Sequence, residues 1–427
     1  MPQLTLMDVL FVVPYMPNLI RTRPYNLIRH LSERGHRVTL FTLWVNEQEK
    51  EQIKHLRQIC HEVQALPMPA WQSLWNSLRA VPGRHPLQTV YSWKPKLVSR
   101  LNGRSPYDVV HVEHLRGARY AVYLKQHTRL PVVWDSVDCI SHLFRQAAAQ
   151  SKSLLGRLRS RFELGRSAWY EGWLMDKFDH VLVTSPVDRQ ALQALTPAGA
   201  TAAPISVLAN GVDGANFYAN PAVKRDPETL VVSGKMSYHA NVTMTLYLVR
   251  EIMPLVWAQR PSVKLIIAGK DPAREITALA ENPNVIVTGT VPSMTPYLQQ
   301  ATLAVAPITY GAGVQNKVLE AMACATPVIA TSRAVSALQA VPGQDLLVAD
   351  SAADFAAAIL DVLDSPETQE RLGRNGRHYV KKYHQWPAIA ARLETIYQKA
   401  IGSLAGKIRE SSEKKPVADR TAQILVE

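Results

Sequence analysis

Short apolar runs alternate with amphipathic stretches along most of the chain. In the first half the apolar run Met7–Val13 fits a buried strand, and Arg37–Leu43 fits a second one. Between them Leu27, Ile28 and Leu31 fall on one helical face, so this part of the chain is a predicted β-α-β unit. Further strands are predicted at Tyr107–Glu113, Pro131–Val137 and His180–Ser185.

The second half repeats the same alternation. Short apolar runs, each followed by a turn and a helical pattern, occupy Thr229–Gly234, Val263–Gly269, Val285–Gly289, Leu303–Ile308 and Pro327–Thr331. Strands that alternate with helices indicate parallel sheets covered on both faces. The sequence therefore predicts an α/β protein with two doubly wound, Rossmann-like domains. Ligands of such domains bind beyond the carboxyl ends of the strands, and we expect the site in the cleft between the two.

Turn-forming residues place the junction between the domains near residues 205–228, where Asn, Gly, Asp and Pro cluster. We expect an N-terminal domain over residues 1–205 and a C-terminal domain over residues 206–385. A helix over residues 386–402, predicted to pack back on the N-terminal domain, carries one apolar face formed by Trp386, Ile389, Leu393, Ile396 and Tyr397. Residues 403–427 are polar and charged, which predicts a flexible tail.

Composition agrees with two folded domains. The chain has 427 residues, of which 47% are hydrophobic and 19% charged, which exceeds one ordinary core and argues against disorder. Cys60, Cys139 and Cys324 are too widely spaced for a disulfide framework or a metal site, so a reducing compartment is expected. The apolar run near the N-terminus is short and broken by prolines, which is untypical of a signal peptide or a membrane span. These features predict a cytoplasmic protein.

The net charge of +13 is unevenly distributed: residues 1–200 carry +11 and the remainder +2. A basic half should attract an anionic partner such as a membrane surface, a phosphate-bearing acceptor or a nucleic acid. Two segments, Arg79–Arg104 and Arg145–Arg166, each hold six basic residues, and the first also holds Tyr91 and Trp93. They fit either an anionic membrane interface or a solvated helix face. No recognised nucleic-acid module is present, so no nucleic-acid partner is expected.

The richest candidate chemistry lies in residues 307–322. A predicted strand ends there, a loop with Gly311 and Gly313 follows, and a helix is predicted to start near Gln315. Glycines let backbone approach a ligand, and the amides of a first helical turn attract anions. Lys317 and Glu320 are three residues apart and share a helical face, where Lys can neutralise a diphosphate and Glu can accept hydrogen bonds from ribose hydroxyls. An ordinary surface Lys–Glu pair is the alternative, and the loop glycines favour the ligand site.

A second candidate cation is Lys235, which follows Gly234 directly after a predicted strand. A departing diphosphate needs its developing charge stabilised, and a preorganised lysine can supply that. The alternative is a solvated loop lysine.

Four motifs resemble glycosyltransferase family 4, the retaining enzymes of the GT-B fold. Val207–Asp213, followed by Phe217, resembles the interdomain "NGVD…F" turn, and Leu319–Thr331 resembles the "LEAMA-G-PVVAT" signature. Ser233–Met236 resembles the phosphate-binding Gly-Arg or Gly-Lys, and Asp345–Val348 resembles the "G-LV-" strand. The resemblance covers most of residues 205–400 and is weaker over residues 1–200.

The resemblance implies a GT-B architecture and sugar transfer from a UDP- or GDP-sugar to a glycan or lipid-linked acceptor, with retention at the anomeric carbon and a role in polysaccharide biosynthesis. No Asp-x-Asp motif is present, so we expect no metal and no other cofactor. We expect peripheral association with the inner face of the membrane. The expected catalytic residues are Lys235, Lys317, Glu320 and His114. The expected donor-binding residues are Gly234, Gly311, Gly313, Val314, Gln315, Asn316, Leu319 and Thr290. The expected acceptor-binding residues are Arg21, Arg23, Glu113, Asp135 and Asp138.

The chain also departs from the family pattern. Ala312 stands where the family often has the first Glu of an E-x7-E pair, and Lys317 stands where many members have a loop proline, as in an exopolysaccharide-associated subgroup. His239-Ala240-Asn241 replaces a usual Lys-Gly, so Lys317 is expected to take over part of the phosphate role. A non-catalytic sugar-nucleotide-binding protein and a GT-B sugar-nucleotide epimerase are the alternatives. A dehydrogenase is not expected, because no Gly-x-Gly-x-x-Gly follows a strand.

Overall fold

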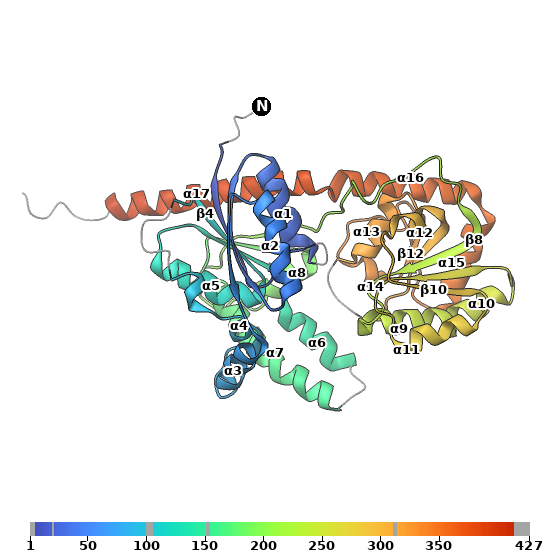
Figure 1. Ribbon diagram of the computed structural model, residues 1–427, viewed down its shortest axis with the longest axis horizontal. Coiled ribbons are helices and arrows are strands. Elements are labelled where there is room, and N and C mark those ends of the chain that lie inside the picture. The colour runs from blue at the N-terminus through green and yellow to red at the C-terminus, as the bar shows by residue number, and fades with distance from the viewer. Residues whose placement is uncertain (1–4, 19–20, 100–105, 151–153, 311–313, 414–427) are drawn as a thin grey trace, which may run out of the picture.

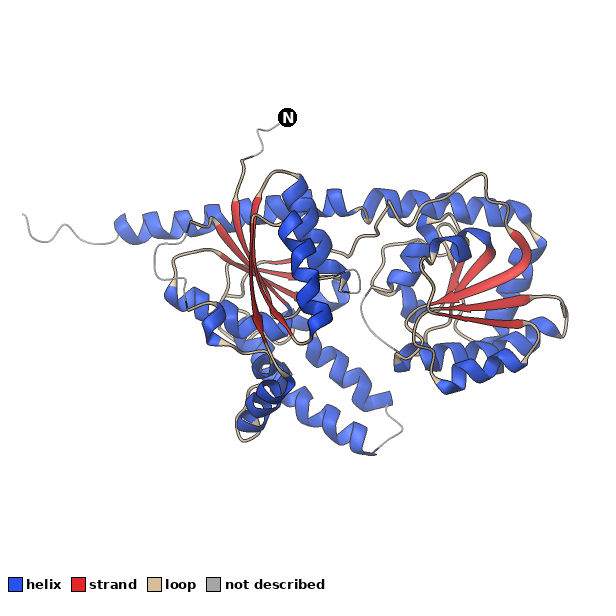
Figure 2. Ribbon diagram, viewed as in Figure 1, coloured by secondary structure: helices blue, strands red, loops and turns tan. Residues whose placement is uncertain are grey.

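Two α/β units lie side by side, and each has one sheet with helices on both faces (Figures 1 and 2). The computed structural model describes residues 5–18, 21–99, 106–150, 154–310 and 314–413. Within these residues every strand pairing inside the two sheets is parallel. The predicted doubly wound α/β architecture is therefore confirmed.

Both sheets have the same strand order. The described strands of the first sheet are, in spatial order, β3 (Glu62–Pro67), β2 (Arg37–Trp44), β1 (Asp8–Val13), β4 (Val109–Glu113), β5 (Val132–Val137), β6 (His180–Val183) and β7 (Ile205–Val207). Those of the second sheet are β10 (Val285–Gly289), β9 (Lys264–Ala268), β8 (Asp226–Ser233), β11 (Ala301–Ala306), β12 (Val328–Ala330) and β13 (Leu347–Val348). The order reverses between β1 and β4 and again between β8 and β11. At such a switch point the loops that follow the two adjacent strands run in opposite directions and leave a crevice for a ligand.

Helices cover both sheets because the central strands are apolar on both faces. The helical segments of the first unit are α1 (Thr22–Glu33), α2 (Glu47–Ile59), α3 (Ala70–Ala80), α4 (Leu87–Tyr91), η1 (Pro95–Leu97), α5 (His114–His127), α6 (Ile140–Gln150), α7 (Leu154–Leu174) and α8 (Pro186–Gln193). Those that follow are α9 (His239–Tyr247), η2 (Leu248–Ile252), α10 (Met253–Trp257), α11 (Arg274–Thr277), η3 (Ala278–Glu281), α12 (Thr295–Gln300), α13 (Asn316–Ala323), α14 (Ser332–Val335), α15 (Ala352–Asp364), α16 (Pro366–Tyr383) and α17 (Trp386–Glu413). No helix in the described parts of the chain combines the length and apolarity that crossing a bilayer requires.

Two strands escaped prediction, and both lie at the edges of the first sheet. β3 is only partly buried along its length, and β7 has three half-buried residues, so neither carries a continuous apolar signal. β7 pairs in parallel with β6 from Ile205 to Val207, so the first sheet continues two residues beyond the expected boundary at residue 205.

The C-terminal helix α17 runs along the first unit (Figure 1). Its predicted apolar face, from Trp386 to Tyr397, is buried together with Leu27, Ile28 and Leu31 of α1. The helix does not end at residue 402 but continues to Glu413. Helix-forming residues follow Gly402, and the next proline is Pro416, so nothing in the sequence stops the helix earlier.

The chain passes from the first unit to the second through the Asn210-Gly211-Val212-Asp213 turn. The amide of Val212 donates to the carbonyl of His384 at 2.7 Å, so the linker and the start of α17 run together. A side chain at Gly211 would lie 2.6 Å from the Trp386 ring, which explains why glycine is needed there. The Asp213 carboxylate accepts the amide of Ala215 at 3.0 Å and so closes the turn.

Candidate active site

In the second unit the ends of the neighbouring strands β8 and β9 are packed backbone against backbone. Gly234 follows β8 with a φ of 148°, and Gly269 follows β9 with a φ of 156°. A Cβ atom on Gly269 would lie 1.7 Å from the carbonyl oxygen of Gly234, and one on Gly234 would lie 2.7 Å from Nδ2 of Asn241. Both positions therefore require glycine, and the loop that carries Lys235 is held in one place.

Asn241, in the first turn of α9, hydrogen-bonds to both residues predicted to supply the cations, Lys235 and Lys317. Its Nδ2 donates to the carbonyl of Lys235 at 3.0 Å. Its Oδ1 accepts from the ammonium of Lys317 at 2.5 Å. From the sequence, Asn241 was only part of a departure from the family pattern, and this bridge was not predicted. Its side-chain amide, which can both donate and accept a hydrogen bond, was the available signal.

Lys317 and Glu320 lie in the first two turns of α13 and interact electrostatically. Burial lowers the pKa of Lys317 to about 8, with Glu320 opposing that shift. Burial raises the pKa of Glu320 to about 7, with Lys317 opposing that shift. Among the described residues, no side chain donates a hydrogen bond to the Glu320 carboxylate. An ammonium and a carboxylate acceptor thus lie together at the start of a helix, whose dipole favours anions.

Lys235 has a looser environment. Its ammonium lies 3.9 Å from Oδ2 of Asp271, and both side chains are more than half exposed. Exposed pairs of this kind hold their partners weakly, so Lys235 is free to turn toward a phosphate. The loop after β11 is anchored nearby, where Tyr310 hydrogen-bonds His239 at the start of α9.

The remaining predicted donor residues divide into three groups. Gly311 and Gly313 lie outside the described residues. Val314, Gln315 and Asn316 are half-buried at the start of α13, and Thr290 is exposed after β10. The side chain of Leu319 is fully buried in the core of the second unit. Donor contact by Leu319 stays a prediction.

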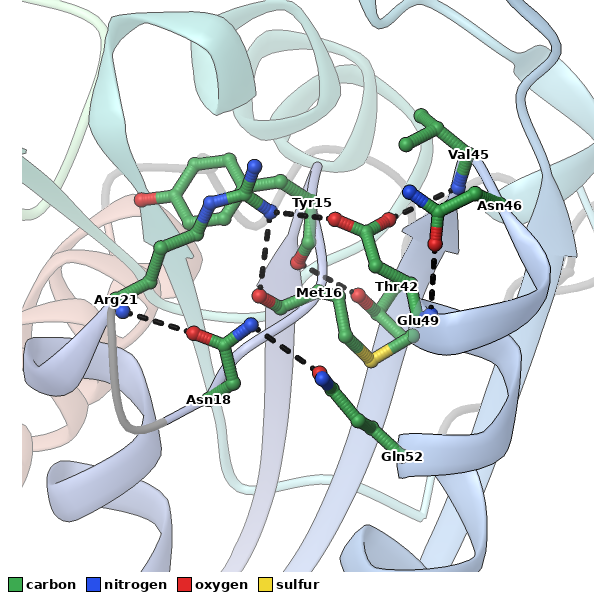
Figure 3. Close-up of polar contacts among 9 residues, drawn as sticks. All are labelled: Tyr15, Met16, Asn18, Arg21, Thr42, Val45, Asn46, Glu49 and Gln52. Atoms are coloured by element: carbon green, nitrogen blue, oxygen red, sulfur yellow. Dashed lines mark hydrogen bonds and ion pairs between the residues drawn. The ribbon is translucent and has the colours of Figure 1, made fainter. Parts of the chain in front are cut away.

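In the first unit, the loop after β1 is fixed by a group of polar contacts shown in Figure 3. Nη1 of Arg21 lies 3.3 Å from both the Met16 carbonyl and the Glu49 carboxylate. The Arg21 guanidinium also lies 4.9 Å from the centre of the Tyr15 ring. The carbonyl of Tyr15 accepts from the Thr42 hydroxyl at 2.8 Å, which ties the loop to β2. Arg21 keeps 39% of its side chain exposed, so it still offers donors to a ligand.

Glu113 ends β4 and His114 begins α5, at the switch point of the first sheet. His114 has a φ of 64°, a left-handed conformation that is strained for histidine and that clusters at functional sites. Burial lowers the pKa of His114 to about 4, so the ring is neutral near pH 7. Its Nδ1 accepts from the Arg116 amide at 3.2 Å, which assigns the proton to Nε2 and makes that atom a donor. Burial raises the pKa of Glu113 well above its ordinary value, and Glu113 hydrogen-bonds Tyr15.

Arg23 and Asp135, both predicted to bind the acceptor, form an ion pair with each other. Both are almost fully buried, and Nε and Nη2 of Arg23 each lie 2.8 Å from Oδ2 of Asp135. Nη1 of Arg23 donates to the Leu208 carbonyl at 2.9 Å and to Oδ1 of Asn210 at 3.0 Å. The pair therefore holds the interdomain linker against the first sheet, and acceptor contact by either residue stays a prediction. Sequence spacing did not reveal this contact, because 112 residues separate the partners.

Asp138 lies closer to the space between the units. It accepts from the Thr184 hydroxyl at 3.3 Å, and burial together with the nearby Asp188 carboxylate raises its pKa to about 6. Acceptor contact by Asp138 stays a prediction.

A cavity of about 760 Å³ lies between the two units. The first unit contributes His142 and Gln146 of α6 and Asp188 of α8. The second contributes, among others, Thr309 after β11 and Arg333 of α14. The predicted cations do not line this cavity, but Thr309 belongs to the same loop that leads to α13. The cavity and the β8–β11 switch point are thus neighbouring parts of one interdomain region, and its polar lining was not predicted from the sequence.

Comparisons with known proteins give family matches over both units. A model described as "Glycosyl transferase 4-like domain" matches residues 20–211, and one described as "Glycosyl transferases group 1" matches residues 227–365. The MMP alpha-(1->4)-mannosyltransferase of Mycolicibacterium hassiacum is 39% identical over 113 residues, which span 25% of this chain and only 27% of that relative.

Solved structures share the whole fold. Sucrose-phosphate synthase from Thermosynechococcus elongatus is 18% identical with a TM-score of 0.67, over 93% of this chain and 100% of that one. HepE of Anabaena, solved with UDP and glucose, is 14% identical with a TM-score of 0.65, over 92% of this chain and 99% of that one. Likeness at this identity establishes the fold alone, and the predicted GT-B architecture is confirmed. Together with the family matches over both domains, it shows that this chain belongs to the GT-B glycosyltransferases, with a family-4-like first domain and a group 1 second domain.

Proposed function

We propose that this chain is a retaining glycosyltransferase. In this proposal it transfers a sugar from a UDP- or GDP-sugar to a glycan or lipid-linked acceptor, without a metal, in polysaccharide biosynthesis. The observation that carries the proposal is the pairing of Lys317 and Glu320 at the start of α13, beside the β8–β11 switch point. A nucleoside diphosphate presents anionic oxygens and ribose hydroxyls, which are the complements of those two groups. HepE, which shares the fold, has been solved with UDP and glucose, which supports this class of donor.

The proposed chemistry breaks the bond between the anomeric carbon and the diphosphate oxygen and forms a bond to the acceptor oxygen on the same face. The acceptor's proton passes to the departing phosphate. Lys317, Lys235 and the first amides of α13 stabilise the negative charge that develops on the diphosphate. The Nε2–H of His114 donates a hydrogen bond to a substrate hydroxyl across the cleft, a role that its neutral ring favours over that of a base.

The proposal is tested with the purified chain in two steps. Thermal-shift screening across UDP, GDP, ADP and TDP should identify one nucleotide that stabilises the protein, by about 2.7 kcal/mol at 100 times its Kd. The matching nucleotide sugars are then incubated with the protein in the presence of a chelator, and nucleotide release and sugar products are measured. Stabilisation without release or product formation supports a non-catalytic binder instead. Interconversion of the free sugar nucleotide supports an epimerase.

Donor affinity should depend on pH in a bell shape. Burial raises the pKa of Glu320 to about 7, so below that pH the carboxyl is protonated and loses part of its capacity to accept ribose hydroxyls. Burial lowers the pKa of Lys317 to about 8, so above that pH the ammonium is neutral and loses its attraction for phosphate. We expect the tightest binding between these two values and a decline of up to about tenfold per pH unit on either side.

Isothermal titration of a nucleotide sugar from about pH 5.5 to about pH 9 measures this profile. A nucleotide sugar is preferred to the free diphosphate because a terminal phosphate itself titrates near about pH 6. The Glu320→Gln variant should lose the acidic limb and keep the basic one. A wild-type affinity that stays constant across the range would contradict the assignment of these two groups to the donor.

A further inference from the structure

Helix α3 carries a row of large apolar side chains that nothing in the described structure covers. Trp71, Leu74, Trp75 and Leu78 are 69%, 61%, 51% and 55% exposed. Their spacing of three and four residues places them on one side of the helix. The opposite side faces the protein, where Ser73 is buried and Nδ2 of Asn76 donates to the Trp93 carbonyl at 3.0 Å. We call these four residues the α3 stripe.

The exposed apolar surface continues onto helix α7. Nη1 of Arg166 donates to the His85 carbonyl at 3.2 Å, and Nη2 hydrogen-bonds the Val81 carbonyl just beyond α3. The Arg166 guanidinium also stacks on the Phe162 ring, 4.0 Å from its centre. Phe162 is 46% exposed and thus lies next to the end of α3. In Figure 1, α3 and α7 project from the same end of the first unit.

The charge around the α3 stripe has one sign. No Asp or Glu occurs between Glu62 and Asp108, whereas Arg79 and Arg84 lie directly after the stripe. The Arg79 guanidinium lies 4.8 Å from the Trp75 ring centre, so it is part of the same surface. On α7, the carboxylates of Glu163 and Glu171 are buried and face the protein interior. A partner for this surface must be apolar and anionic at once.

We propose that the α3 stripe docks this chain on an anionic lipid bilayer. Helix α3 lies in the plane of the interface, with its tryptophans and leucines at the boundary between headgroups and acyl chains. Tryptophan is favoured at that depth because its ring is apolar while its N–H remains hydrated. Arg79 and Arg84 then meet the lipid phosphates. An ordinary soluble surface does not expose four such side chains in one row.

The position of the surface also connects the bilayer with the cleft. Helix α6 packs along α7 over most of its length, and His142 and Gln146 of α6 line the interdomain cavity. Helix α7, which adjoins the α3 stripe through Arg166, and helix α6, which lines the cavity, thus form one helical hairpin. A lipid-linked acceptor, which rests on the proposed function, would leave the membrane beside the cavity that receives it. Docking itself does not depend on that acceptor.

Vesicle flotation of the full chain tests the proposal. Wild-type protein should float with phosphatidylcholine vesicles that contain about 30 mol% phosphatidylglycerol, and binding should weaken with added salt and with phosphatidylcholine alone. The double variant Leu74→Glu/Leu78→Glu should bind the anionic vesicles at least about tenfold more weakly. Its donor affinity should equal that of the wild type, because α3 lies far from α13 (Figure 1).

The matched control is Leu255→Glu/Ile286→Glu, which alters two exposed apolar residues of the second unit, 42% and 47% exposed. This control should float as the wild type does. Equal flotation of the α3 variant and the wild type overturns the proposal, as does equal wild-type binding to neutral and anionic vesicles. Wild-type protein that ignores vesicles but dimerises, and becomes monomeric in the α3 variant, overturns it in favour of a second copy of the chain.

Discussion

Glu320→Ala should weaken nucleotide-sugar binding by about 10²- to 10³-fold while the protein stays folded. The carboxylate is expected to accept hydrogen bonds from two ribose hydroxyls, and hydrogen bonds to a charged group contribute about 1.5–3 kcal/mol each. Two such bonds, not fully additive, give about 3–4 kcal/mol, and each 1.4 kcal/mol is a factor of about ten in affinity. Isothermal titration with the nucleotide sugar identified by thermal shift measures the change directly.

Lys317→Ala and the double variant extend this test. Lys317 loses its buried counter-charge in Glu320→Ala, so the two single effects should not add. The matched control is Glu47→Ala on α2, whose carboxylate forms an exposed pair with Lys50 and should leave donor affinity unchanged. Donor affinities that stay at the wild-type value in folded Glu320 and Lys317 variants would remove the donor site from α13.

Asp135→Ala should lower the free energy of unfolding of the first domain by about 3–5 kcal/mol, which is the usual cost of leaving a buried charge unpaired. The Arg23 guanidinium would lose its only ion-pair partner among the described residues while still bonded to Leu208 and Asn210. Such a loss is a large fraction of the about 5–15 kcal/mol that stabilises a typical domain. Urea unfolding followed by tryptophan fluorescence and by circular dichroism measures it.

The control for that experiment is Asp8→Ala, which removes an ion pair on the surface of the same sheet. Asp8 lies 3.1 Å from Arg37, with side chains 31% and 61% exposed, so its loss should cost less than about 1 kcal/mol. Asp135→Asn should fall between the two, because the amide oxygen still accepts from Arg23. If Asp135→Ala and Asp8→Ala unfold alike, the buried pair does not hold the linker in place.

The sequence predicted the fold well because the buried strands of parallel α/β sheets give a strong pattern of apolar residues. Central strands such as β1 and β11 are apolar on both faces, and each is separated from the next by a helix. Edge strands β3 and β7 lack that signal, since none of their residues is fully buried on either face. The helix α17 extends beyond the expected residue 402 because the polar and charged residues that follow, which were read as a flexible tail, are also compatible with a helix.

The candidate site was predictable only where its residues are close in sequence. Lys317 and Glu320 share a helix, so their spacing alone placed them on one face. Asn241 meets Lys317 across 76 residues, and Arg23 meets Asp135 across 112, so both contacts depend on how the strands are ordered in the sheet. Hydrophobic periodicity likewise could not distinguish the exposed α3 stripe from a buried helix face. Whether another element covers a helix depends on the whole fold.

A crystal structure of the chain with the nucleoside diphosphate that stabilises it tests the central claim most directly. The account predicts ribose hydroxyls within about 3 Å of the Glu320 carboxylate and diphosphate oxygens against Lys317, at the end of β11. A nucleotide bound elsewhere would contradict it. One such place is the basic cavity along α16 that is lined by Arg374, Arg377 and Lys381, with the α13 helix start left empty.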